Sequence, residues 1–201
     1  MTAINRRDVL GLIGAVPAAL AFTWTQEETV RAAGYAQQAR EQAGATGQAY
    51  TPKFFTAHEY ETVVLLSDMI IPRDARSGSA SDAGTPQFID YIVSEQAARQ
   101  TAMRGGLAWL DTECLRRFDR LFIGATDANR RQVLDDIAFP ARARAALRPG
   151  VVFFTTMRDL VASGFWSSRV GVADLGYVGN RPIAEWTGAP ANVLQKLGVT
   201  Y

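Results

Sequence analysis

The chain has 201 residues, 48% of them hydrophobic and 20% charged, so it is long enough to bury one core of ordinary size. Its formal net charge of +1 excludes the electrostatic footprint of a nucleic-acid-binding protein or of a protein held on an anionic membrane surface. A single cysteine excludes an internal disulfide, and a single histidine excludes a metal site built from several imidazoles.

The first 22 residues carry the pattern of an export signal. Arg6 and Arg7 precede an apolar run over residues 9–22, which is shorter than the roughly 20 residues that a membrane-spanning helix needs. Small residues at positions 19 and 21 form an A-x-A exit, as in a cleavable signal. Residues 5–10 resemble the twin-arginine translocation motif. We predict a twin-arginine-type signal over residues 1–22; the alternative is a first core helix of the domain.

The twin-arginine route carries folded proteins, typically ones that bind a cofactor before export. The rest of this chain contains no dinucleotide-binding G-x-G-x-x-G, no P-loop and no C-x-x-C. We therefore expect the cofactor to belong to a partner, and we assign no catalytic, cofactor-binding or metal-ligating residue to this chain. The expected location is the periplasm, with membrane contact only through the signal or a partner.

Residues 23–50 are rich in Ala and Gln and hold few large apolar side chains, which predicts a linker or a solvated helix. The domain proper is expected over residues 51–201. Its first helix begins with a capping box formed by Thr56 and Glu59, and Pro72 ends it.

A polar loop over residues 73–84 follows that helix. Thr85 is expected to cap the next helix, with Pro86 in its first position. Apolar spacing then predicts three further helices, which cover residues 103–122, 127–138 and 151–163, with Gly164 as the stop of the last. The sequence thus predicts an all-α fold, a compact bundle of about five helices.

The tail from residue 165 onward reads differently, because it is rich in Gly and aromatic residues and has no long periodic run. Such a segment is too aromatic for ordinary disorder, so we expect an extended, irregular tail that either straps across the bundle or faces a partner. Trp, Tyr and Arg dominate interface anchors. The predicted partner-interface residues are Trp166, Tyr177, Asn180 and Trp186.

Three single residues have both a chemical and a structural interpretation. Cys114 falls on the apolar face of a predicted helix, which favours a buried, inert thiol over a nucleophile. His58 lies in the first turn of a helix beside Glu59, and we expect it to be solvated or locally bonded rather than a catalytic base. Asp68 precedes a helix end, where a carboxylate usually bonds to the backbone or to a nearby cation.

Several short motifs occur in an order that resembles the gluconate 2-dehydrogenase subunit 3 family. The resemblance covers about residues 50–190, with mild departures at Phe55 and Thr85, where that family usually has Leu and Val. The matching stretches are F-T-A-H-E at 55–59, L-S-D-M-I-I-P at 66–72, A-G-T-P-Q-F-I-D at 83–90, F-F-T-T-M-R-D-L at 153–160, G-F-W-S-S at 164–168 and D-L-G-Y-V-G-N at 174–180.

The resemblance implies a non-catalytic small subunit that binds, stabilises and co-exports an FAD-dependent sugar or polyol dehydrogenase or oxidase of the glucose-methanol-choline type. It places FAD in the flavoprotein catalytic subunit and none in this chain, and in some such complexes a cytochrome c subunit is a third member. Two alternatives stay open on the sequence. One is a stand-alone exported ligand-binding helical protein, and the other is an independent enzyme with His58 or a buried carboxylate as base.

Overall fold

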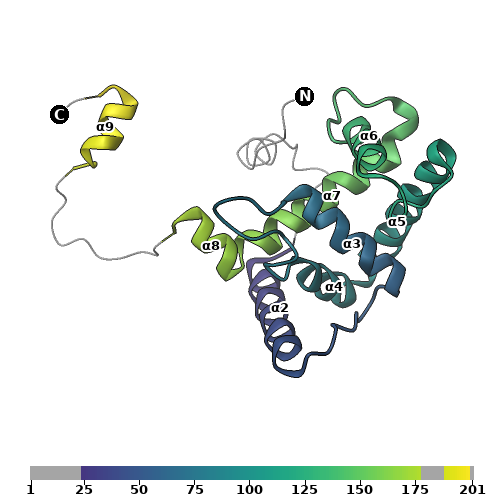
Figure 1. Cartoon of the computed structure of the whole chain (residues 1–201), viewed down its shortest axis with the longest axis horizontal. Helices are drawn as coiled ribbons and strands as arrows, with labels where there is room; N and C mark the ends of the chain where they lie inside the picture. The colour runs from purple at the N-terminus through teal and green to yellow at the C-terminus, as the bar shows by residue number, and fades with distance from the viewer. Residues whose placement is uncertain (1–23, 178–187, 200–201) are drawn as a thin grey trace.

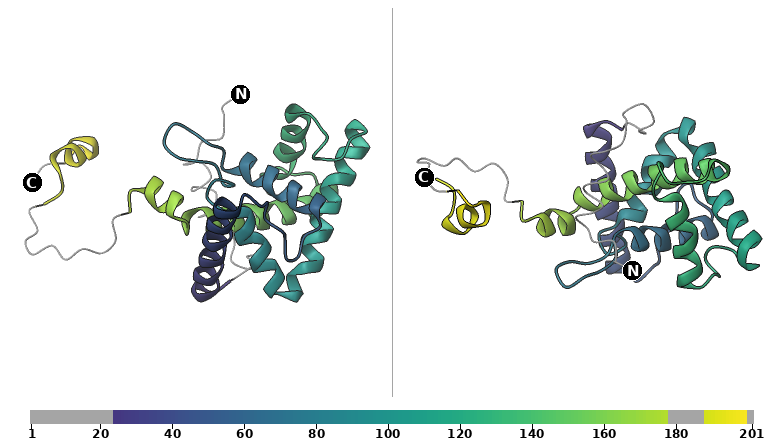
Figure 2. Two further views of the ribbon diagram at one scale, coloured as in Figure 1. Left: turned by 60° about the horizontal axis from the view of Figure 1, so that its bottom comes forward. Right: turned by 90° about the horizontal axis from the view of Figure 1, so that it is seen from above.

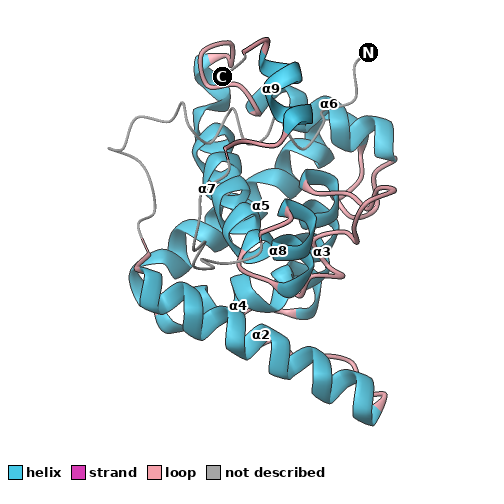
Figure 3. Cartoon of the chain, turned by 90° about the vertical axis from the view of Figure 1, so that its left-hand side faces the viewer, coloured by secondary structure: helices cyan, strands magenta, loops and turns pink. Residues whose placement is uncertain are grey.

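The computed structural model describes residues 24–177 and 188–199 (Figure 1). This part of the chain is all-α, as predicted, and contains no strand. It holds eight α-helices rather than about five, joined by loops (Figure 3). They are α2 (Gln26–Thr46), α3 (Ala57–Ile70), α4 (Thr85–Glu95), α5 (Ala97–Phe118), α6 (Asp127–Ile137), α7 (Arg148–Trp166), α8 (Arg169–Leu175) and α9 (Ala191–Leu197), with a 3-10 turn at Ala145–Leu147 before α7.

The central helix of the bundle is α7, which contacts α2, α3, α4, α5, α6 and α8. Twelve of its 19 residues are buried, so most of its circumference lies in the core. No helix in the described ranges is both long and apolar enough to cross a bilayer.

The helix α2 covers most of the segment for which the sequence left a linker or a solvated helix open. Thr25 caps it through a capping box with Glu28. Although most of its surface is solvated, Ala32 and Ala36 are buried in the core, a role that the composition did not indicate. Tyr35 stacks on Tyr91 of α4 with ring centroids 4.7 Å apart, so α2 is packed onto the bundle.

Local stop and start signals set most helix ends where the sequence predicted them. The capping box of Thr56 and Glu59 is present, and α3 ends at Ile70, two residues before Pro72. Thr126 caps α6 by accepting a hydrogen bond from the backbone N–H of Asn129. The predicted cap of α4 was wrong by one residue: Gly84 is the N-cap, with a φ of 81° that glycine adopts without strain.

The predicted bounds of two helices were wrong. The helix α5 begins at Ala97 rather than at residue 103, and it ends at Phe118 rather than at residue 122, because Asp119 takes the left-handed conformation of a C-cap. Gly164, the predicted stop of the last bundle helix, is buried inside α7, where a Cβ would lie 2.9 Å from the Phe88 ring. The tail is consequently not irregular throughout, since it contains the end of α7 and the two short helices α8 and α9.

A buried carboxylate fastens the α2–α3 connection to α4. Asp90 is fully buried and accepts a hydrogen bond of 2.8 Å from the hydroxyl of Tyr50. It also accepts hydrogen bonds from three successive backbone N–H groups, those of residues 53–55, at 2.7–3.2 Å. Four donors satisfy this buried charge, which is the condition for tolerating one inside a core.

The helices α5 and α7 cross at close range because glycine occupies the contact on each side. A Cβ on Gly106 of α5 would overlap the ring of Phe153, and a Cβ on Gly150 of α7 would overlap the indole of Trp109. Next to this crossing, Gly105 has open space around its Cβ position. The two adjacent glycines of α5 therefore differ in function: one is required by packing and the other is not.

We expect Gly106→Ala to lower the free energy of unfolding by about 1–3 kcal/mol, because the added methyl group overpacks the crossing. The matched control Gly105→Ala should raise it by about 0.5–1 kcal/mol through helix propensity alone. Urea unfolding followed by circular dichroism measures both. Equal effects of the two substitutions would contradict the close crossing of α5 and α7.

Candidate partner interface

The predicted interface residues fall in different environments. Trp166 is the last residue of α7 and is half-buried against the core, with its ring edge-on to Phe165 at 5.6 Å. Tyr177 follows α8 and is 61% exposed. Asn180 and Trp186, like the signal residues Arg6 and Arg7, lie outside the described residues. Of the four predicted interface residues, Tyr177 is therefore the one that the structure places on an open surface.

The direction of α8 is fixed by a tight turn after α7. The Ser168 hydroxyl donates to the backbone carbonyl of Phe165 at 2.6 Å and accepts from the backbone N–H of Gly171 at 3.0 Å. A Cβ on Gly171 would overlap the Phe165 carbonyl oxygen, so this turn requires glycine. As a result, α8 extends away from the bundle (Figures 1 and 2).

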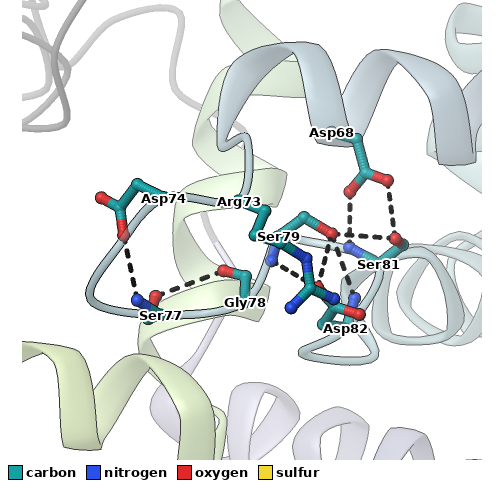
Figure 4. A network of polar contacts seen from close by, with 8 residues as sticks. All are labelled: Asp68, Arg73, Asp74, Ser77, Gly78, Ser79, Ser81 and Asp82. Carbon is teal, nitrogen blue, oxygen red and sulfur yellow. Dashed lines mark hydrogen bonds and ion pairs between the residues drawn. The ribbon is translucent and has the colours of Figure 1, made fainter.

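The loop over residues 71–84 is held by its own hydrogen bonds (Figure 4). Asp68, at the end of α3, accepts from both the backbone N–H and the hydroxyl of Ser81, at 2.7 and 2.6 Å. Asp82 accepts from the backbone N–H and the hydroxyl of Ser79, at 2.7 and 3.0 Å. The structural role predicted for Asp68 is confirmed, and the base of the loop is ordered.

An ion pair on the outer side of the loop adds to these hydrogen bonds. The guanidinium of Arg73 lies 2.6 Å from the carboxylate of Asp82. The hydrogen bonds from the backbone N–H and then from the hydroxyl of Ser79, followed by the charge of Arg73, lower the pKa of Asp82. This carboxylate therefore stays ionised at neutral pH and continues to hold the loop.

The tip of the loop is joined to α8. Asp74 accepts from the backbone N–H groups of Arg76 and Ser77 at 2.8 and 2.9 Å, which closes a tight turn. Arg76 in turn donates to the backbone carbonyl of Asp174 at 2.7 Å, and its guanidinium lies 3.8 Å from the carboxylate of that residue. We name the loop 71–84, α8 and Tyr177 together the loop–α8 corner.

Exposed apolar side chains gather on and after this corner. Five of the nine large hydrophobic residues that are exposed in the described ranges come after residue 174: Leu175, Tyr177, Val193, Leu197 and Val199. The helix α9, to which two of them belong, has no buried residue and lies apart from the bundle (Figures 1 and 2). Exposed apolar groups concentrated in one segment are typical of a surface that another protein covers.

His58 and Cys114, the two residues whose side chains most often take part in catalysis, both have structural roles here. His58 Nε2 lies 2.6 Å from Asp111 of α5, whose other carboxylate oxygen accepts from the backbone N–H of Phe122 at 2.9 Å. The pair therefore connects α3, α5 and the connection that follows α5. Cys114 is buried, as predicted, and burial raises the pKa of its thiol to about 11, which keeps it protonated and unreactive near neutral pH.

A hollow of about 320 Å³ lies between α5 and α7, beside their glycine crossing. Its lining is apolar except for Thr156 and the indole N–H of Trp109, and the Thr156 hydroxyl already donates to the carbonyl of Val152. Sugar sites need several converging polar groups, which this lining lacks. Among residues 24–177 and 188–199, no group of three or more His, Cys, Asp or Glu is placed to hold a metal ion.

Comparison with known proteins gives one match. The family described as gluconate 2-dehydrogenase subunit 3 matches residues 57–188, about two thirds of the chain. The chain belongs to this family. No curated protein and no solved structure matches it.

Membership of the gluconate 2-dehydrogenase subunit 3 family makes the chain an accessory subunit that forms a complex with a catalytic partner. The family match runs from the start of α3 through α8 and the entire loop–α8 corner. It leaves α2 and α9 outside, so the corner belongs to the part of the fold that this chain shares with its family.

Sequence reasoning singled out Tyr177 and the polar loop but missed the hydrogen bond that joins this loop to α8. Arg76 and Asp174 are 98 positions apart, and no local pattern pairs residues over that separation. The two arginines of the loop, Arg73 and Arg76, were the available signal, because an exposed guanidinium commonly bonds to a carbonyl or carboxylate on a neighbouring element.

We expect Arg76→Ala to release the loop from α8 while changing the free energy of unfolding by less than about 1 kcal/mol, because the interaction is at the surface. Amide hydrogen exchange should become faster over residues 73–78 and 169–175. The control is Arg31→Ala, which removes an exposed ion pair with Glu27 on α2. Unchanged exchange at both segments in Arg76→Ala would show that the bond does not order the corner.

Proposed function

We propose that this protein is the non-catalytic small subunit of an FAD-dependent sugar or polyol dehydrogenase or oxidase of the glucose-methanol-choline type, which it binds, stabilises and co-exports. FAD resides in the flavoprotein catalytic subunit, and a cytochrome c subunit joins some complexes of this kind. The complex operates in the periplasm after export by the twin-arginine route. Family membership supports the accessory role.

The observation that carries this proposal is the ordered loop–α8 corner with exposed apolar residues beside it. Leu175 and Tyr177 are 54% and 61% exposed at the end of α8. Tyrosine is enriched among residues that dominate binding energy, and an obligate interface buries more than roughly 2,000 Å² of mostly apolar surface. The corner provides one contiguous part of such an interface.

The second part is α9. Its Val193 and Leu197 are four residues apart and share one face of the helix, with exposed fractions of 40% and 68%. A helix of seven residues is too short to be stable alone in water, so its stability must come from packing. An apolar groove of the flavoprotein that receives this face would supply that packing.

The predicted export signal lies on the small subunit, whereas FAD would be bound by the catalytic subunit. A flavoprotein must fold around FAD in the cytoplasm, and the twin-arginine route transports folded cargo. A signal with Arg6 and Arg7 on the small subunit would therefore carry both chains.

We expect the double substitution Leu175→Asp with Tyr177→Asp to weaken co-purification with the flavoprotein by more than about tenfold, because it buries two unpaired charges in an apolar contact. The measurement is affinity capture from cells expressing both chains, scored by bound FAD and by the mass of the captured protein. Val152→Asp, at an exposed apolar residue on the other half of α7, is the control. A soluble, monodisperse wild-type chain that never captures the flavoprotein would refute the proposal.

Replacing both signal arginines, Arg6→Lys with Arg7→Lys, should leave the flavoprotein in the cytoplasm while the purified complex keeps its full activity. Cell fractionation followed by flavin and activity assays measures both effects. Arg31→Lys, outside the signal, is the control. Undiminished export of the flavoprotein in the double variant would show that its export does not depend on Arg6 and Arg7.

A further inference from the structure

The connection between α6 and α7 is strongly basic. Residues 139–149 contain Arg142, Arg144 and Arg148, all exposed, and no acidic residue. Within the described part of the chain, neither Arg142 nor Arg148 forms an ion pair with a carboxylate. We name residues 135–148 the arginine end of the bundle.

The carboxylates near this end are already shared among other arginines. Asp136 pairs with Arg117 at 2.7 Å and reaches Arg144 only at 3.6 Å. Glu113 pairs with both Arg116 and Arg117, and hydrogen bonds from Arg116 and then Arg117 lower its pKa to about 2. Two carboxylates thus serve three arginines, and the Arg144 side chain remains 70% exposed.

One of the free guanidinium groups is held in a defined orientation. The Cζ atom of Arg142 lies 4.1 Å from the centroid of the Phe139 ring, as expected for a cation–π contact. A stacked guanidinium keeps its N–H edges free and loses less side-chain entropy when it binds a planar anion. Arg142 is therefore prepared to form paired hydrogen bonds to a carboxylate.

A hollow of about 310 Å³ lies between these groups, lined by Asp135, Asp136, Phe139, Arg142 and Arg144. The lining decides between classes of anionic partner. A bilayer or a nucleic acid presents anionic groups everywhere and would press some of them against Asp135 and Asp136. The face of a protein can place one acidic side chain between the arginines and other groups opposite the aspartates.

We infer that the arginine end binds the acidic face of a second protein, with a Glu or Asp carboxylate seated in the hollow between Arg142 and Arg144. This site lies at the other end of the bundle from α8 (Figures 1 and 2). The helix α7, which separates the two ends, spans about 28 Å. The arginine end is therefore free when the loop–α8 corner is occupied, and the chain can bridge two proteins.

The test uses the purified full chain and two probes: an immobilised Glu-rich peptide and vesicles containing phosphatidylglycerol. We expect saturable, salt-sensitive binding to the peptide, weakened about tenfold in Arg142→Ala with Arg144→Ala because two charge-assisted hydrogen bonds are lost. The control is Arg31→Ala with Arg131→Ala, which removes two arginines from exposed helical ion pairs and gives the same net charge. The control should bind within about twofold of the wild type.

Three results would overturn the inference. Equal weakening in both double variants would mean that net charge alone attracts the peptide. Tighter binding to vesicles than to peptide, lost in Arg142→Ala with Arg144→Ala, would assign the arginine end to a lipid surface. Absence of saturable peptide binding would remove the site. Because the flavoprotein takes no part in the assay, its failure to bind elsewhere leaves this test unaffected.

Discussion

The buried carboxylate of Asp90 is the interaction on which the arrangement of the helices depends. It gathers the hydroxyl of Tyr50 and three backbone N–H groups from the α2–α3 connection onto α4. Each of these donors, if left buried and unpaired, would cost about 1–3 kcal/mol, so alternative placements of that connection are strongly disfavoured. With the connection fixed, α2 lies on α4, and Phe88 of α4 packs against Gly164 of α7.

The helix α7 sets the distance between the arginine end and the loop–α8 corner. It is buried along most of its length and contacts α5 through Gly106 and Gly150, where even one methyl group would not fit. Such close packing leaves little room for α7 to slide or rotate. The arginine end lies at the start of α7, and α8 follows its last residue, so the bundle would act as a rigid spacer between them.

The sequence predicted those features that depend on neighbouring residues. The capping box of Thr56 and Glu59 and the stop at Pro72 act within a single turn of helix, and the boundaries they mark agree with the structure. Where a feature depends on a contact between residues far apart in the sequence, the prediction from local sequence was wrong or absent. Gly164 has the appearance of a helix stop but is required by the close approach of Phe88. Ala32 and Ala36 are buried because α2 packs against α4 and α7. Arg76 bonds to a residue 98 positions away. The short helices α8 and α9 lack the length over which periodicity can be detected.

The loop 71–84 and α9 differ in when their conformational entropy is lost. Hydrogen bonds from backbone N–H groups to the carboxylates of Asp68, Asp74 and Asp82 order the loop during folding of the subunit, so docking of this loop incurs little further entropic cost. The helix α9 has no buried residue to hold it, and in the proposed complex its packing would come from the partner. Assembly should accordingly begin with a rigid encounter at the corner and finish with the tail, and dissociation should proceed in the reverse order, with the tail peeling away first. The lifetime of the complex can then be adjusted through α9 alone without altering the rate at which the two proteins meet.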